Sequence, residues 1–125
     1  MKKKIVIFIL LVISIVIIVL VIRMLSNPLR KSEEDMRETI LELTPIGMSM
    51  DDVIKVIEDK DEWKLRHIWH EYGYRDYSQG EIGVKSIRVY LGEYNLSTTG
   101  VSVFWGFDEN SKLIDVYVLK ESDAL

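Results

Sequence analysis

The chain has 125 residues, which leaves room for one small domain besides a membrane segment. It contains no cysteine, and this excludes disulfides, thiolate metal sites, a cysteine nucleophile and lipidation through cysteine. The net charge is −4, and it becomes −8 for the rest of the chain once four basic residues flanking the apolar N-terminal run are set aside: Lys2, Lys3, Lys4 and Arg23. A body this acidic argues against nucleic acid as a partner.

The N-terminal part of the chain has the composition of a membrane span. An apolar run begins at Ile5 and ends at Ile22, broken only by Ser14. As a helix, about 18 residues rise ~27 Å, close to the hydrocarbon thickness of a bilayer. The run is longer than the apolar core of a signal peptide, and the only alanine of the chain is Ala124, so a small-residue cleavage site is missing. We expect residues 1–25 to form an uncleaved anchor in the lipid bilayer, with a cleaved signal peptide as the alternative.

Basic residues on both sides of this run bear on its orientation. By count, the positive-inside rule is nearly balanced between the two sides. The compact cluster at the N-terminus is typical of a signal-anchor, so we expect a single-pass protein of the cell membrane with a cytoplasmic N-terminus and an extracytoplasmic body. The residues compared are Lys2, Lys3 and Lys4 on one side and Arg23, Arg30 and Lys31 on the other.

Two short amphipathic helices are predicted after a linker at residues 26–31. The first begins after Ser32, a good N-cap with acidic residues behind it, and ends before Pro45. The second begins after Ser49 and ends near Asp59. Each has an apolar stripe at helical spacing: Met36, Ile40 and Leu43 in the first, and Met50, Val53, Ile54 and Ile57 in the second.

From residue 63 to 72 the period of the sequence changes to two, which predicts a strand. Trp63, Leu65, His67 and Trp69 alternate with Lys64, Arg66, Ile68 and His70. Successive side chains of a strand point to opposite faces, so His67 and His70 should diverge and should not share a metal ion. The zinc signatures His-Glu-x-x-His and His-x-x-Glu-His are absent, and we expect no metal and no cofactor.

Three further strands are predicted at residues 84–94, 101–107 and 113–120, separated by turn-rich segments at 74–83, 95–100 and 108–112. Helices followed by strands with hairpin-length links predict an α+β fold. In it, two short helices pack on a four-stranded antiparallel meander sheet within a soluble domain at residues 32–125. The helices should cover one face, and the other, which carries Arg, His, Tyr and Glu, should meet solvent or a partner.

Aromatic residues are concentrated between positions 63 and 77, which hold five of the twelve in the chain. Tyr, Trp and Arg are the residue types that anchor protein interfaces. The candidate partner-binding residues are therefore Trp69, Tyr72, Tyr74, Arg75 and Tyr77. The alternative is that the tryptophans belong to the core and that the tyrosines pack along a hairpin.

Two segments carry a resemblance to known proteins. "IGMSMDDVIKVIED" and "FWGFDENSKLIDVYV" resemble the SmpA/OmlA lipoprotein family, whose fold is similar to that of β-lactamase inhibitor proteins. The resemblance covers about residues 39–120 and implies a non-enzymatic module that binds other proteins through its sheet. The chain departs from that family in lacking the lipidated cysteine and in having an extra or longer strand at 63–72. "KSIRVYLGEY" and "VFWGFDENSKLIDVYVLKE" also resemble small membrane-anchored, uncharacterised proteins of low-GC Gram-positive bacteria.

The sequence favours a membrane-tethered protein-binding module without catalytic activity. Alternatives are an immunity-type protein that blocks a toxin at the membrane and a small accessory subunit of a membrane complex. A hydrolase using His67 or His70 is the fourth alternative. It lacks a Gly-x-Ser-x-Gly elbow, a phosphate loop and a zinc signature, and the acidic pairs Asp51–Asp52 and Asp59–Asp61 lie at predicted helix ends.

Overall fold

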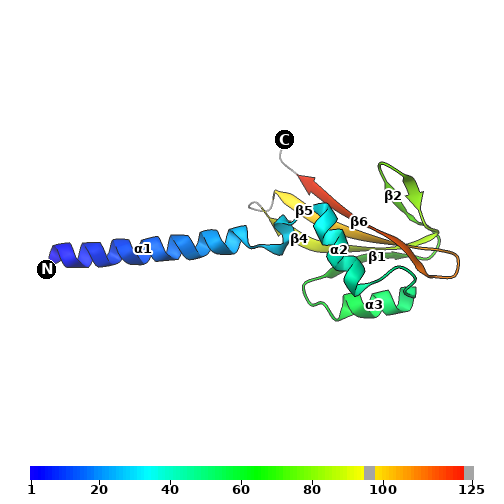
Figure 1. Ribbon diagram of the computed structural model, residues 1–125, viewed down its shortest axis with the longest axis horizontal. Helices are drawn as coiled ribbons and strands as arrows, with labels where there is room; N and C mark the ends of the chain where they lie inside the picture. The colour runs from blue at the N-terminus through cyan, green and yellow to red at the C-terminus, as the bar shows by residue number, and fades with distance from the viewer. Residues whose placement is uncertain (95–97, 123–125) are drawn as a thin grey trace.

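A computed structural model describes residues 1–94 and 98–122 of the protein (Figure 1). A long N-terminal helix leads into an α+β body, as the sequence predicts. The helical elements are α1 (Lys2–Leu25), the 3-10 helix η1 (Pro28–Arg30), α2 (Glu33–Leu43) and α3 (Met50–Glu58). The strands are β1 (Lys64–Trp69), β2 (Tyr74–Asp76), β3 (Gly80–Ile82), β4 (Lys85–Tyr94), β5 (Thr99–Phe107) and β6 (Leu113–Ser122).

Helix α1 stands apart from the body, and none of its side chains is buried (Figure 1). It has 24 residues, with an unbroken apolar run on either side of Ser14. At ~1.5 Å per residue it is ~36 Å long, which exceeds the hydrocarbon core of a bilayer. Ser14 donates its hydroxyl proton to the Leu10 carbonyl oxygen over 2.9 Å, so the one polar side chain of the run is satisfied within the helix. Helix α1 is long and apolar enough to cross a membrane.

Both predicted helix starts are confirmed. The Ser32 hydroxyl accepts a hydrogen bond from the Asp35 amide (3.1 Å), and the Ser49 hydroxyl accepts one from the Asp52 amide (3.2 Å). Each satisfies an amide that the first helical turn would otherwise leave without an acceptor. Helix α2 ends two residues before Pro45, since the residue that precedes a proline disfavours the helical conformation.

The main sheet is an antiparallel meander in the order β1-β4-β5-β6, which confirms the four predicted strands. The segment 74–83 was expected to be a connecting loop. Instead it forms a separate two-stranded hairpin, because β2 and β3 pair with each other rather than with the main sheet. Of the turn predicted at 95–100, residues 95–97 lie outside the described part of the chain.

Strand β1 does not keep one regular alternation, and here the sequence prediction was wrong. Its register against β4 shifts between Leu65 and His67. This bulge inserts one residue, so Trp63 and Leu65 lie on the side of the helices, whereas His67 and Trp69 lie on the opposite side. Ile68, which was expected to face away from Leu65, pairs with buried Ile87 and packs against the core.

The core lies between the helices and one face of the sheet (Figure 1). Helix α2 packs against β6, and α3 contributes Val53 and Ile57 to the same apolar cluster. Trp105 of β5 is fully buried and donates from Nε1 to the Thr44 hydroxyl over 3.0 Å. The sheet contributes mostly β-branched and aromatic residues, which suit a strand covered on one face.

Candidate functional site

The face of the sheet opposite the helices, called the open face below, carries polar and aromatic side chains. Alternation along each strand places every second residue there. The residues are Ser86, Arg88 and Tyr90 of β4, Ser102, Phe104 and Gly106 of β5, and Asp115 and Tyr117 of β6. As the sequence predicts, this face bears the charged and aromatic residues, while their neighbours along each strand form the core.

The β2–β3 hairpin folds over one end of the open face. Tyr74 lies against Phe104 and Tyr117, with ring centroids 5.8 and 6.0 Å away. Gly106 permits this approach, because a Cβ atom at that position would lie 2.8 Å from Cε1 of Tyr74. Ser86 also donates its hydroxyl proton to the Tyr72 carbonyl oxygen over 2.9 Å. The hairpin is therefore fixed to the sheet.

Two ionisable groups of the hairpin are perturbed by their surroundings. Burial, and then the negative charges of Asp115 and Asp76, raise the pKa of the Tyr74 phenol well above its ordinary value, so this group stays neutral. Asp76 accepts hydrogen bonds from the Ser78 amide (2.8 Å) and hydroxyl (2.7 Å). These hydrogen bonds lower the pKa of Asp76, which closes the hairpin turn as a carboxylate.

Beside the hairpin, cationic and aromatic side chains of β1 and β4 remain on the open face. We call this set the open-face strip: Arg66, which contacts the Tyr90 ring, together with His67, Trp69, Arg88 and Tyr90. The rings of His67 and Trp69 stack with centroids 4.7 Å apart, and the Arg66 guanidinium lies 5.2 Å from the Tyr90 ring centroid. Arg88 lies 5.5 Å from the Phe104 ring centroid, at the border with the hairpin. These contacts hold the rings and cations of the strip against one another.

The five partner-binding residues predicted from the sequence are not equally accessible. Tyr77 and Tyr72 are 83% and 63% exposed, and Arg75 is also exposed, whereas Trp69 is half-buried. Tyr74 is 3% exposed because it is the residue that seats the hairpin on the sheet. Trp69 pairs with Ser86, the residue that binds the Tyr72 carbonyl, so the strip and the hairpin lie side by side.

The two histidines lie at the end of β1, at an exposed edge of the sheet. His67 stacks on Trp69, and His70 follows the last residue of the strand. Among residues 1–94 and 98–122, no group of three or more His, Asp or Glu side chains is placed to hold a metal ion. The acidic pairs at 51–52 and 59–61 lie at the start of α3 and just after its end.

Sequence reasoning left four residues of the strip outside the candidate set, namely Arg66, His67, Arg88 and Tyr90. Alternation does place Arg88 and Tyr90 on the polar face, and it sets Arg66 opposite Leu65, but it assigns His67 to the same face as Leu65 because a bulge has no clear signal in one sequence. The neighbouring run of charged and aromatic residues in β1 was the available clue.

Comparison of the chain with protein-family models, curated proteins and solved structures found no match.

Proposed function

We propose that this protein is a non-catalytic binding module, tethered by α1 to the cell membrane, that contacts another protein through its open face. The observation that supports the proposal best is the open-face strip, a set of arginine and aromatic side chains outside the core of an otherwise acidic body. The contact surface comprises the strip together with Tyr72, Arg75 and Tyr77 of the adjacent hairpin region.

The residue types favour a protein partner. A few residues carry most of the binding free energy of an interface, and Trp, Tyr and Arg are enriched among them. Cation–π and stacking contacts hold Arg66 and His67 against neighbouring rings, so less side-chain entropy is lost on binding. Arg66 is exposed and Arg88 is partly exposed on this face, and guanidinium groups pair well with carboxylates. We therefore expect the partner to present acidic groups.

The proposed topology places the N-terminus in the cytoplasm and the body outside. It is supported by the compact cluster of Lys2, Lys3 and Lys4 before α1. The body then meets proteins of the cell surface or of the outer side of the membrane.

The proposal is tested by photocrosslinking in native membranes. A photoreactive amino acid at Tyr72 or Tyr77 of the full chain should give a discrete crosslinked product. The same amino acid at Lys55, exposed on α3 on the other side of the sheet, is the matched control. Arg66→Glu with Arg88→Glu should abolish the product without lowering the amount of protein. Equal products from all three positions, or none from the open face, would contradict the proposal.

A further inference from the structure

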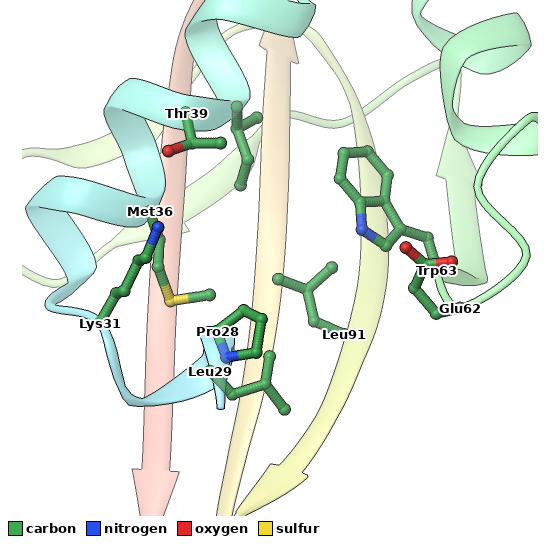
Figure 2. A pocket seen from close by; sticks show the side chains of 9 residues that line it. Pro28, Leu29, Lys31, Met36, Thr39, Glu62, Trp63 and Leu91 are labelled. Carbon is green, nitrogen blue, oxygen red and sulfur yellow. The ribbon is translucent and has the colours of Figure 1, made fainter. Parts of the chain in front are cut away.

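The helical layer leaves part of the sheet uncovered. Between α2 and the segment preceding β1, a pocket of about 350 Å³ opens above β4 (Figure 2). Leu91 lies at its floor, Met36 of α2 lies on one side, and Trp63 lies on the other. Ile40 of α2 also lines the pocket. Leu29 of η1 lies at one end of the pocket. The pocket is therefore lined mostly by aliphatic and aromatic carbon.

This pocket lies next to the end of the membrane helix. Its lining includes Pro28, three residues after Leu25, the last residue of α1. Consecutive Cα atoms are ~3.8 Å apart, so Pro28, where the lining begins, lies within ~11 Å of the end of α1. The Lys120 ammonium donates to the Leu29 carbonyl oxygen over 2.9 Å, which fixes η1 to β6. When α1 spans a bilayer, the pocket is therefore held close to the lipid surface.

The rim of the pocket is asymmetric in charge. Exposed Lys31 lies on the α2 side, and Glu62 lies on the opposite rim beside Trp63 (Figure 2). An anionic headgroup would be attracted to the lysine side and repelled from the glutamate side. A hydrocarbon chain that enters the pocket from the bilayer exchanges one apolar environment for another, so little hydrophobic free energy is lost. A helix, which is ~10–12 Å across with its side chains, is too wide for a pocket of this volume.

We propose that the pocket holds one acyl chain of an anionic membrane phospholipid, whose phosphate lies at Lys31. This inference rests on the proposed membrane anchoring by α1, and it does not depend on the protein-binding role of the open face. The lipid then acts as an additional tether and completes the apolar layer over β4.

The test uses the full-length chain in vesicles of phosphatidylglycerol and phosphatidylcholine with or without bromine on the acyl chains. Bromine quenches tryptophan fluorescence on contact. In a Trp69→Phe variant, which keeps Trp63, brominated lipid should cause a clear loss of emission. The matched control is Trp63→Phe, which keeps Trp69 on the other face of the sheet and should lose much less. Trp105 is fully buried and is present in both variants.

Two further variants identify the pocket and the headgroup. Thr39→Phe, introduced with Trp69→Phe, fills the rim from an exposed position of α2 and should restore the emission. Lys31→Glu should reduce quenching in phosphatidylglycerol vesicles to the level seen in phosphatidylcholine alone. Quenching that survives Thr39→Phe would mean that the body only rests on the membrane, and this would overturn the proposal. Quenching that falls as protein density rises would indicate a second copy of the chain in place of the lipid, and this would also overturn it.

Carbonate extraction separates this inference from the anchoring on which it rests. Protein that stays in the carbonate-washed membrane without selective quenching of Trp63 would overturn the lipid site alone. Release of the protein by carbonate would contradict both the anchoring by α1 and the lipid site, because the pocket would then have no fixed place at the bilayer.

Discussion

Trp105 and Thr44 form a buried hydrogen bond that joins the centre of the sheet to the end of α2. The indole Nε1 of Trp105 donates to the Thr44 hydroxyl over 3.0 Å, and that hydroxyl donates to the Ile40 carbonyl oxygen over 2.8 Å. Both side chains are fully buried. Each polar atom in this chain of contacts is therefore satisfied without water, which explains why a threonine lies in the core.

Replacing this threonine should destabilise the body. Thr44→Val keeps the shape of the side chain but leaves the Trp105 indole N–H buried without an acceptor, which should lower the free energy of unfolding by about 1–3 kcal/mol. The measurement is urea unfolding of the full chain in detergent micelles, followed by tryptophan fluorescence. Thr39→Val, the same change at an exposed position of α2, should change the free energy of unfolding by less than ~0.5 kcal/mol. Equal effects of the two changes would show that the Trp105 contact contributes nothing.

Arg37 should protect the outer edge of β6. It donates from Nε to the Val116 carbonyl oxygen over 2.9 Å and lies 2.6 Å from Asp115 Oδ1. Arg37→Met removes both contacts, and because the pair is partly exposed the expected loss of unfolding free energy is only about 1 kcal/mol. Since β6 then presents a free edge carbonyl, self-association should also increase, measured by light scattering.

The matched control for Arg37 is the surface pair on α3. Lys55 lies 3.9 Å from Asp52, and both side chains are well exposed. Lys55→Met should therefore leave stability and self-association unchanged. If it has the same effect as Arg37→Met, general loss of positive charge and not the edge contact is responsible.

The sequence predicts those parts of the fold whose causes are local. Ser32 and Ser49 cap helices because their hydroxyls reach amides three residues later, and strict alternation around Trp105 indicates a strand whatever its neighbours are. Other features depend on residues distant in the sequence. The bulge near Arg66 depends on pairing with Arg88 and Val89. The position of Tyr74 depends on Phe104 and Tyr117. Nothing in the sequence near position 74 indicates that Tyr74 is buried while Tyr72 and Tyr77 are exposed.

Gly106 should be required for the hairpin to lie on the sheet. In Gly106→Ala the new Cβ would lie 2.8 Å from Tyr74 Cε1 and 3.2 Å from Ile82 Cγ2, so the hairpin must move away at a cost of about 1–3 kcal/mol. Hydrogen–deuterium exchange of the full chain in micelles should show faster exchange in β2 and β3, with β5 and β6 unchanged. Gly100→Ala, on the same strand but next to the Tyr90 ring, should leave the hairpin unaffected. Faster exchange throughout the sheet would instead indicate general destabilisation.

The Tyr74 phenol should make stability fall at alkaline pH. Its hydroxyl is buried without a hydrogen-bond partner among the described residues, so Tyr74→Phe should cost little or nothing at neutral pH. Burial raises its folded-state pKa above the ordinary value of 10.0, so the unfolded chain loses this proton at lower pH than the folded chain does. The contribution of the neutral Tyr74 phenol to the free energy of unfolding is therefore complete at pH values below 10.0. It is lost as the pH rises from there toward the pKa of the phenol in the folded chain.

This dependence can be measured as the unfolding free energy of the full chain in micelles at about pH 9 and about pH 11. The wild-type chain should lose more stability between these two conditions than Tyr74→Phe does. Tyr77→Phe is the matched control, because Tyr77 is exposed on the same hairpin and should behave like the wild type. A Tyr74→Phe chain that loses as much stability as the wild type would show that the alkaline effect comes from elsewhere, for example from Tyr117, whose pKa is also raised by burial. A large loss of stability in Tyr74→Phe at neutral pH would mean that the buried hydroxyl has a partner, such as a bound water, that stabilises the hairpin.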